Sequence, residues 1–523
     1  MTIECISFKK TGYFSELISD YLEQTDSLKE FYNRFPKLDN FKTQIDEKQN
    51  AFSSENRDVL VNVLQEQYKA VNASKSTLSN IEALAKSHTF TITTGHQLNL
   101  FTGPLYFLYK IVSTINLTLE LKRKFPKHNF VPIYWMATED HDFDEINYFN
   151  FQGKKVQWSR KSNGAVGELD TEGLNEVYEA FSKTLGLGKN ADLKHDNLSA
   201  ATRYLANALF ADYGLVVLDA NDTQLKRLFI PYVEDELENQ SSFNAVSDAS
   251  KKLENIKSSY NAQVNPREIN LFYLGKGLRE RIVFEDNVYK VLNTSFSWSL
   301  SEINKVLLEH PEQFSPNVIM RPLYQEVILP NLCYIGGGGE LAYWLQLKSY
   351  FEKMKVTFPM LLLRNSVLVK TEKQSEKQEK LALKNSDLFL KQELLIQKKT
   401  KHLSSINIDF SEQKEHLKRQ FEDLYSLAEQ TDKSFLGAVA AQERKQIKGL
   451  EHLEKRLMKA EKRKLKDQLK KIKNLQNELF PNQSLQERNI NFSELYLEFG
   501  DELIPILIKN LKPLQGDFTL LTI

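Results

Sequence analysis

The segment from Thr371 to Phe480 constrains the fold of this chain most strongly, because it predicts a long helical excursion. It contains no proline, only two glycines, and an excess of Lys, Glu, Gln and Leu, which favours helices. Its apolar residues recur at spacings of three and four, a pattern typical of a coiled-coil seam. The seam comprises Phe410, Leu417, Phe421, Leu424, Ala428, Leu450, Leu453, Leu457, Leu465, Leu469, Ile472, Leu475 and Leu479, with a polar interruption at Glu461. Breaks near Ser404–Asp409 and Thr431–Gly437 predict two or three antiparallel helices.

The rest of the chain predicts short buried strands that alternate with helices. The expected strands are Thr89–Thr94, Phe130–Met136, Gly214–Asp219, Asn317–Met320 and Cys333–Ile335. This alternation is typical of an α/β protein with a doubly wound parallel sheet. We therefore expect a core over residues 1–370, with N-terminal helices over 1–88 and an insertion near 150–212. The coiled coil follows over 371–480, and residues 481–523 return to the core through a strand at Phe518–Ile523.

Charge and composition exclude several classes of protein. The chain has 69 basic and 69 acidic residues, so no overall field attracts nucleic acid or an anionic membrane. The helical segment holds 25 basic and 18 acidic residues, and the remainder is correspondingly acidic. Cys5 and Cys333 are too few for a disulfide scaffold or a four-cysteine zinc site. Neither a signal peptide nor an apolar run of about 18 residues is present, so we expect a cytoplasmic protein.

Three constellations could carry chemistry, and the first follows the first core strand. It contains Gly95, His96, Gln97 and Asn99, ahead of an apolar helix over residues 105–122. Ligands of open parallel sheets bind beyond the carboxyl ends of the strands, where a glycine lets the backbone approach them. His96 and the helix N-terminus could then hold a phosphate or carboxylate. The alternative is a turn glycine and a histidine that caps the helix.

The second constellation is an acidic string directly after the strand that ends at Met136. It runs Glu139, Asp140, His141, Asp142, Phe143, Asp144 and Glu145. So many acids meet near a buried strand only where cations or ligands compensate them. They could orient an amine, act as a general base or bind a divalent cation. The alternative is a solvated turn. One histidine without a thiolate makes a poor zinc motif, and we predict no metal site.

The third constellation is a run of four glycines, Gly336–Gly339, followed by Glu340 and Tyr343. Such a loop can pass close to a ligand, and Gly338 lies at its centre. It has neither the lysine of a P-loop nor a GxGxxG pattern. Upstream, Arg321 and Gln325 stand four residues apart and could face the same cleft and clamp a carboxylate. A flexible connection and a structural salt bridge are the respective alternatives.

These motifs, in this order, make the chain resemble the cysteine ligase (cysteine-adding enzyme) family of bacillithiol biosynthesis. The resemblance rests on TTGHQLNLFTGPLYFLYK, VPIYWMATEDHDFDEIN, SPNVIMRPLYQEVILPNLCYIGGGGELAYWLQLK, the coiled-coil insert and the terminal strand. It implies a Rossmann-like core with connecting insertions, akin to class I aminoacyl-tRNA synthetases and nucleotidyltransferases. It also implies a coiled coil that mediates homodimerisation. The implied reaction joins the carboxyl group of cysteine to the amine of glucosaminyl-malate.

The resemblance assigns the cleft to the three constellations. The expected catalytic residues are His96, Asp140, His141, Asp142 and Asp144. The expected substrate-binding residues are Gly95, Gln97, Asn99, Glu139, Arg321, Gln325, Gly338, Glu340 and Tyr343. His96 would stabilise developing negative charge, and an aspartate would take the proton from the amine. Glu139 or Glu340 would hold the cysteine ammonium group, and Arg321 the malate carboxylates.

Activation of a free carboxylate predicts ATP or another nucleotide as cosubstrate. The chain has a single Gly-His in place of a full HIGH signature and lacks a KMSKS-type loop, and the resemblance suggests a nucleotide near the coiled coil. Two other functions therefore stay open. One is a nucleotide-binding or regulatory protein without ligase activity. The other is an RNA-binding accessory protein that uses the basic coiled coil, although the acidic body disfavours nucleic acid.

Overall fold

The computed structural model describes residues 1–185 and 195–523, which divide into two compact units. The first, here called the core unit, contains residues 3–368 and 486–521. The second, the helical unit, contains residues 1–2, 369–485 and 522–523. Apart from two residues at each end of the chain, the helical unit is therefore an insertion within the sequence of the core unit.

The centre of the core unit is a five-stranded parallel sheet. Its strands are β2 (Thr89–His96), β3 (Asn129–Met136), β6 (Val216–Asp219), β12 (Asn331–Gly336) and β13 (Met360–Leu363). They lie in the order β13-β12-β2-β3-β6, and every neighbouring pair is parallel. The chain thus builds the sheet outward in one direction from β2 and then in the other from β12. This order confirms the predicted doubly wound sheet, and its switch point lies between β2 and β12.

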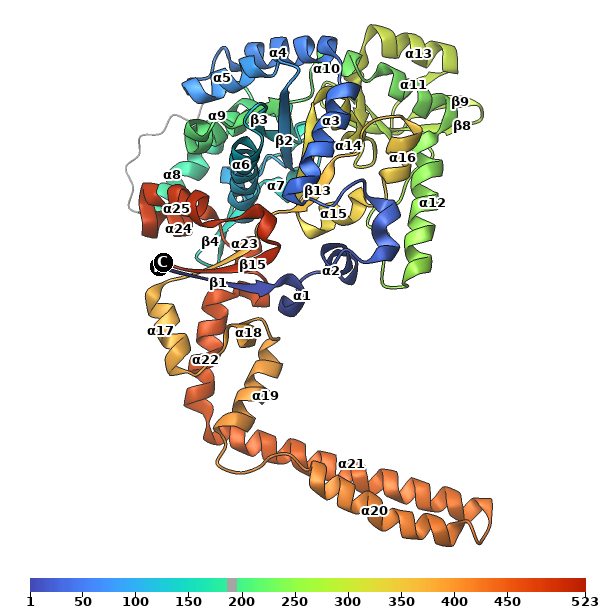
Figure 1. Ribbon diagram of the computed structural model, residues 1–523, viewed down its shortest axis with the longest axis vertical. Helices are drawn as coiled ribbons and strands as arrows, with labels where there is room; N and C mark the ends of the chain where they lie inside the picture. The colour runs from blue at the N-terminus through green and yellow to red at the C-terminus, as the bar shows by residue number, and fades with distance from the viewer. Residues whose placement is uncertain (186–194) are drawn as a thin grey trace. The chain divides into compact units, whose positions relative to one another are not determined.

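Helices pack against the parallel sheet from both sides (Figure 1). The helix α6 (Tyr106–Lys124) contacts β2 and β3, because most of its residues are apolar and buried. The other helices of the first half of the core unit are α1 (Phe8–Thr11), α2 (Glu16–Leu22), α3 (Phe41–Ala51), α4 (Ser54–Tyr68), α5 (Lys75–Ala83), α7 (Phe143–Ile146), α8 (Leu174–Leu185) and α9 (Leu198–Phe210). The second half adds α10 (Thr223–Arg227), α11 (Ile230–Asn239), α12 (Ser241–Ile256), α13 (Leu300–Glu309), α14 (Met320–Ile328), α15 (Gly338–Trp344), α16 (Lys348–Lys353), α23 (Gln486–Asn489), α24 (Phe492–Phe499) and α25 (Leu503–Asn510).

An antiparallel sheet, which the sequence did not predict, stands beside the parallel one. Its strands are β7 (Leu271–Gly275), β8 (Leu278–Glu285), β9 (Val288–Val291), β10 (Ser297–Trp298) and β11 (Phe314–Pro316), in the order β10-β9-β8-β7-β11. The predicted strand at Asn317–Met320 is wrong. The strand β11 ends at Pro316, and the side chain of Asn317 then accepts hydrogen bonds from the backbone N–H groups of Ile319 and Met320, which turns the chain into α14.

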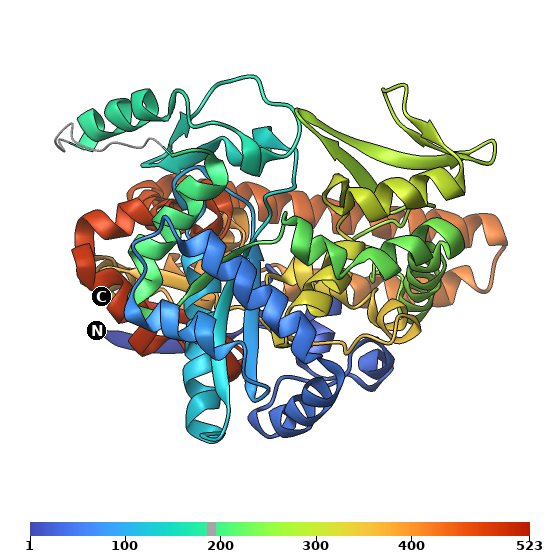
Figure 2. The same cartoon turned by 90° about the horizontal axis from the view of Figure 1, so that it is seen from above.

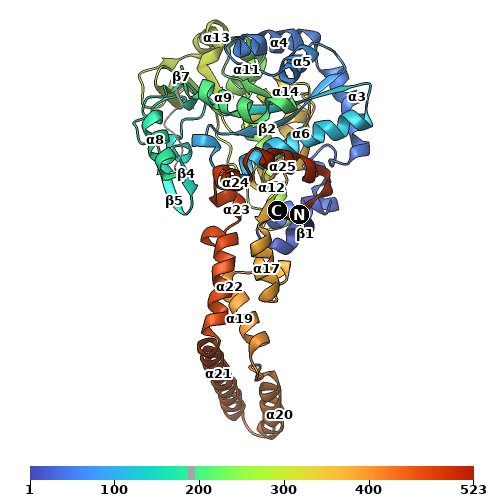
Figure 3. The same cartoon turned by 90° about the vertical axis from the view of Figure 1, so that its left-hand side faces the viewer.

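The predicted insertion near 150–212 forms a hairpin and two helices where it is described. The hairpin joins β4 (Tyr148–Phe151) and β5 (Lys154–Gln157), and α8 and α9 follow. Residues 186–194 of the insertion lie outside the described residues. Figures 2 and 3 place the hairpin and the antiparallel sheet on the same side of the parallel sheet.

The N-terminal region was predicted to be helical throughout. It instead opens with the strand β1 (Thr2–Ser7), and helices follow. This strand pairs in the order β1-β15-β14 with β14 (Val367–Lys370) and β15 (Asp517–Thr522). Most residues of the three strands belong to the core unit. The predicted terminal strand is thereby confirmed.

The helical unit contains α17 (Glu372–Lys380), α18 (Asn385–Leu388), α19 (Gln392–Leu403), α20 (Ser411–Ala428), α21 (Lys433–Lys464) and α22 (Lys466–Leu479). The helices α20 and α21 lie side by side as an antiparallel pair (Figures 1 and 3), which confirms both predicted breaks. Their small core contains Phe421, Ala428 and Val439. Glu461, the polar residue that interrupts the seam, is buried and accepts a hydrogen bond from Ser404 Oγ at 2.9 Å. Its carboxylate therefore has a polar partner within the helical unit.

Candidate functional site

A cavity of about 770 Å³ opens at the carboxyl ends of β2, β3 and β12 in the core unit. This is the switch point of the parallel sheet, where doubly wound proteins bind their ligands. Its walls come from the strand ends, from the glycine loop after β12 and from the antiparallel sheet. The predicted site residues that line it are Gly95, His96, Gln97, Glu139, Asp140, Arg321, Gly338, Glu340 and Tyr343.

His96 belongs to the strand β2 rather than to a loop, which corrects its predicted place at a helix N-terminus. The helix α6 begins only at Tyr106, and the His96 ring packs against the rings of Tyr106 and Phe107. The imidazole is 7% exposed, and Nε2 has no hydrogen-bond partner in the described structure. Burial, followed by the charge of Lys110, lowers the pKa of His96 to about 3. The ring is therefore a neutral hydrogen-bonding group at physiological pH.

This neutral histidine predicts a specific pH dependence of stability. In the unfolded chain, His96 binds a proton below its ordinary pKa of 6.5, whereas in the folded protein it stays neutral down to about pH 3. The free energy of unfolding therefore decreases as the pH falls from 6.5 toward 3. Replacing His96 with Gln should remove a loss of about 2 kcal/mol between pH 6.5 and 5. Urea unfolding of both proteins at the two pH values measures this difference. Parallel pH profiles would show that His96 titrates normally in the folded protein.

The glycine loop positions Glu340, and the carboxylate of Glu340 already has polar partners. β12 ends at Gly336, where a Cβ atom would stand 2.8 Å from Leu341 Cδ1, and α15 begins two residues later. Glu340 accepts hydrogen bonds from Gly337 N at 2.8 Å and from Tyr334 Oη at 2.6 Å, and Lys110 Nζ lies 2.7 Å away. Burial acts to raise the pKa of Glu340, but Lys110 and the hydrogen bonds from Tyr334 and Gly337 together outweigh it, so the pKa is lowered.

Glu139 is held in the same way by a second buried lysine. Lys226 Nζ lies 2.7 Å from its carboxylate, and the lysine side chain is 1% exposed. Both cavity glutamates thus already have a cationic partner, which argues against their predicted role as sites for the cysteine ammonium group. The sequence offered one signal for this pairing. Lys110 is a cation within the apolar first part of its helix, far from the cations at the end of that helix, whereas nothing distinguished Lys226.

Asp140 is the one acid among the described lining residues without a lysine partner. Gln97 Nε2 donates to it at 3.0 Å, the backbone N of His141 at 2.8 Å, and Arg279 Nη1 lies 3.9 Å away. Burial acts to raise the pKa of Asp140, but the hydrogen bond from Gln97 and the charge of Arg279 outweigh it, so the pKa is lowered. The carboxylate is therefore ionised and faces the cavity.

The remaining residues of the acidic string do not line the cavity, contrary to prediction. Asp142 is exposed and caps α7 by accepting from Glu145 N at 3.2 Å. Asp144 is exposed and accepts from Asn147 Nδ2, and exposed His141 lies 2.8 Å from Arg279 Nη1. The reason is that the short helix α7 begins at Phe143 and turns the chain away from the strand end. Asn99 also departs from the prediction, since it lines a separate cavity of about 100 Å³.

Arg321 reaches the cavity from α14, between the rings of Trp135 and Tyr334 at 5.6 and 5.7 Å. Its Nη1 donates to Gln325 Oε1 at 3.1 Å, while Nη2 has no hydrogen-bond partner in the described structure. Gln325 was predicted to face the cleft. It does not, because it is fully buried behind Arg321. Tyr343 lines the cavity beside them.

Five further arginines line the cavity, and sequence reasoning missed all of them. They are Arg267, Arg279, Arg281, Arg364 and Arg488. With Lys110 and Arg321 they make seven cations against the three acids Glu139, Asp140 and Glu340. Arg267, Arg281, Arg321 and Arg488 have no carboxylate within 4.0 Å in the described part of the chain. This excess of unmatched positive charge suits an anionic ligand with more than one acidic group.

Two family models match the chain. Residues 1–365 match the "Bacillithiol biosynthesis BshC, N-terminal Rossmann-like domain", and residues 367–523 match the "Bacillithiol biosynthesis BshC, C-terminal coiled-coil domain". The chain belongs to the BshC family. The match confirms the resemblance, the Rossmann-like core and the coiled-coil domain.

Relatives named "Putative cysteine ligase BshC" cover most or all of the chain. The protein from Flavobacterium johnsoniae is 60% identical over 100% of both chains. The relative from Cytophaga hutchinsonii is 39% identical over 98% of this chain and 97% of its own, and that from Bacillus cytotoxicus is 27% identical over 87% and 88%. The BshC family relationship therefore extends across both units.

Within residues 1–185 and 195–523, no group of three or more His, Cys, Asp or Glu side chains is arranged to hold a metal ion. None of the helices in these ranges is long and apolar enough to cross a membrane.

Proposed function

We propose that this chain is a ligase that joins the carboxyl group of cysteine to the amine of glucosaminyl-malate. The observation that carries this proposal is the set of four arginines without acid partners in the switch-point cavity. The malate part of the amine substrate brings two carboxylates, which guanidinium groups bind in bidentate fashion. The relatives named as cysteine ligases support the same reaction.

Within this proposal, each cavity group has a definite task. The carbon–nitrogen bond forms as the amine attacks the activated cysteine carboxyl, the bond from carbon to the leaving group breaks, and the nitrogen loses a proton. Asp140 takes this proton, since it is the ionised acid in the cavity that no lysine neutralises. The neutral His96 hydrogen-bonds the oxygen on which negative charge develops, and Arg321 binds a malate carboxylate.

We also propose that ATP or another nucleotide activates the cysteine carboxyl. The unmatched arginines fit its phosphate groups as well as they fit carboxylates, and activation is the chemistry that the nucleotide supplies when bound. A nucleotide site near the coiled coil stays a prediction.

Thiol profiling tests the proposed function. Cells with and without this gene are labelled for low-molecular-weight thiols, and bacillithiol and glucosaminyl-malate are measured. We expect loss of bacillithiol and accumulation of glucosaminyl-malate when the gene is deleted. An unchanged profile in cells that make bacillithiol would refute the ligase and favour a nucleotide-binding or regulatory role. Salt-sensitive RNA binding with an unchanged profile would favour the RNA-binding accessory role.

We further propose that the chain forms a homodimer through its coiled coil. The pair α20–α21 leaves Leu424, Leu427 and Leu453 between 41% and 53% exposed, and this apolar surface supports self-association. The double change Leu424→Lys and Leu427→Lys should convert a dimer into the 60.6 kDa monomer in sedimentation velocity. Leu308→Lys, a change at an equally exposed leucine on α13, is the matched control and should leave the dimer intact. A wild-type monomer would exclude the proposed dimer.

A further inference from the structure

The helix α14 carries Arg321 into the cavity and Gln325 directly behind it. The two residues stand four apart, so they lie on the same face of the helix. The Arg321 guanidinium is anchored from behind by the hydrogen bond that Nη1 donates to Gln325 Oε1 at 3.1 Å. The position of a guanidinium on three flexible methylenes depends on such anchors.

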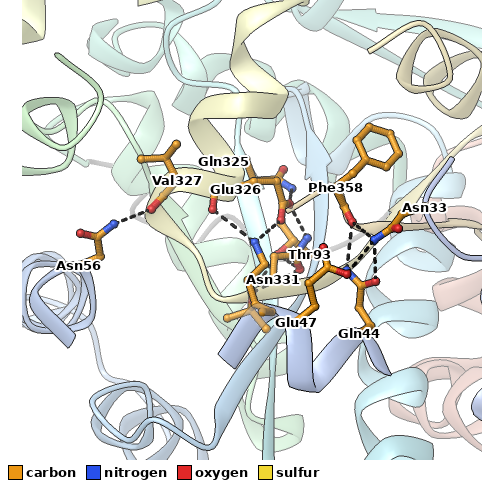
Figure 4. Close-up of polar contacts among 12 residues, drawn as sticks. Asn33, Gln44, Glu47, Asn56, Thr93, Gln325, Glu326, Val327, Asn331 and Phe358 are labelled. Atoms are coloured by element: carbon orange, nitrogen blue, oxygen red, sulfur yellow. Dashed lines mark hydrogen bonds and ion pairs between the residues drawn. The ribbon is translucent and has the colours of Figure 1, made fainter. Parts of the chain in front are cut away.

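Gln325 is itself held by a buried carboxylate. Its Nε2 donates to Glu326 Oε1 at 3.0 Å, and Asn331 Nδ2 donates to the same oxygen at 2.7 Å (Figure 4). Lys48 Nζ lies 3.0 Å from the other oxygen, Glu326 Oε2. The side chains of Lys48 and Glu326 are 2% and 0% exposed, so this ion pair is sealed from solvent.

The carboxylate determines which way the Gln325 amide points. An amide can present either its oxygen or its NH₂ group to a neighbour, and the hydrogen-bond network decides between them. Burial raises the pKa of Glu326, and the ion pair with Lys48 opposes this shift. As the carboxylate partner of Lys48, Glu326 can only accept, so the NH₂ group must face it, and the amide oxygen is then left facing Arg321. The reversed amide would point two N–H donors at a guanidinium that has no acceptor. The Glu326 carboxylate, paired with Lys48, therefore fixes the orientation of the Gln325 amide, and this orientation presents an acceptor to Arg321.

The chain of contacts is anchored in the two strands that flank the switch point. Asn331 opens β12, and its Oδ1 accepts from Thr93 Oγ1 of β2 at 2.9 Å (Figure 4). The helix α3, which carries Lys48, is fixed by Gln44 Nε2, which donates to Phe358 O at 3.0 Å. The groups behind Arg321 thus come from α14, α3 and β12 of the core unit.

We propose that Lys48, Glu326 and Gln325 form a buried relay that positions the Arg321 guanidinium for the anionic substrate. A buried ion pair is weak support for stability, because apolar residues of similar volume often replace it without loss. The orientation that the ion pair imposes on the Gln325 amide explains why Lys48 and Glu326, rather than apolar residues, occupy these buried positions. The relay rests on the proposed function for the identity of the ligand, though not for the placement of Arg321.

The test compares Gln325→Leu with the double change Lys48→Met and Glu326→Met. The first removes the link to Arg321, and the second removes the buried charge that orients the link. We expect both to weaken glucosaminyl-malate binding by about tenfold in calorimetric titrations, as for other residues that orient a binding group, while cysteine binding is unchanged. Crystal structures of both variants should show the guanidinium displaced from its place between Trp135 and Tyr334.

Arg57→Met is the matched control for a purely structural effect. Arg57 is a 2% exposed cation of α4 that donates to the backbone oxygens of Leu84 and of Thr89, the first residue of β2, at the opposite end of this strand from the cavity. It should lower the melting temperature and leave both affinities unchanged. If Gln325→Leu behaves like this control, with Arg321 in place, the relay is refuted. If the wild-type protein binds no glucosaminyl-malate, the proposed function fails, and the crystallographic position of Arg321 alone decides the relay.

Discussion

Changing Asp140 to Asn is expected to reduce the rate of ligation by about 10²- to 10⁴-fold, the usual contribution of a positioned acid–base group. The amide of Asn keeps the shape of the side chain and can still meet Gln97, but it cannot take a proton. Binding of glucosaminyl-malate should change far less than the rate, because the arginines of the cavity remain. Single-turnover ligation assays with preactivated cysteine, together with substrate titrations, separate the two effects.

Asp142→Asn is the matched control for this experiment. Asp142 belongs to the same acidic string, but it is exposed and caps α7, a task that Asn performs equally well. It should therefore retain near-normal ligation. If Asp142→Asn is the inactive protein and Asp140→Asn is active, the base has been assigned to the wrong aspartate.

The lowered pKa of Asp140 adds a pH signature. The carboxylate should stay ionised down to pH values below its ordinary 3.8, so the protonation of Asp140 cannot limit ligation near neutrality. The stability that its hydrogen bonds contribute is present above pH 3.8 and is lost as the pH falls through the lower pKa of the folded state. Such a weak base takes the proton late, once the forming amide bond has made the nitrogen strongly acidic.

Changing Arg364 to Met is expected to destabilise the core unit by about 3–5 kcal/mol, the range found when one partner of a buried ion pair is removed. Arg364 Nη2 lies 2.8 Å from Glu487 Oε1, and the two side chains are 4% and 1% exposed. Without the arginine, the Glu487 carboxylate keeps the hydrogen bonds from Ser366 Oγ and Val367 N but loses its cationic partner. Urea unfolding followed by circular dichroism measures the loss.

The double change Arg364→Met and Glu487→Met separates charge from packing. It should recover most of the lost stability, because no uncompensated carboxylate remains in the interior. It should not recover substrate affinity, since Arg364 also lines the cavity. Equal destabilisation of the single and double variants would show that packing around Arg364, rather than the buried charge, dominates.

The fold was largely accessible from the sequence because parallel strands leave short apolar runs that are easily recognised. The ends of β3 and β12 were therefore placed to within one residue, which led to Asp140 and Glu340, whereas β2 extends two residues beyond its prediction and includes His96. The strand predicted at Asn317–Met320 failed because its apolar residues instead begin α14, after a turn that the Asn317 side chain closes.

The pairings within the site were not accessible. Lys226 and Glu139 are 87 positions apart, and Arg364 and Glu487 are 123 apart, so no local pattern announces either contact. The cavity arginines are similarly scattered between Arg267 and Arg488. Gln325 was correctly linked to Arg321 by its spacing, but only the structure shows that it faces away from the cavity, into the relay with Glu326 and Lys48.

The insertion of the helical unit into the sequence of the core unit has a consequence for biosynthesis. Arg488, and Glu487 which holds Arg364, belong to a stretch of the core unit that is translated after the entire helical unit. While the ribosome is still producing α17 to α22, the cavity lacks one of its cations, and Arg364 lacks its counter-ion. The full set of cavity cations, and the pair of Arg364 with Glu487, can therefore form only after the last segment of the core unit has been synthesised.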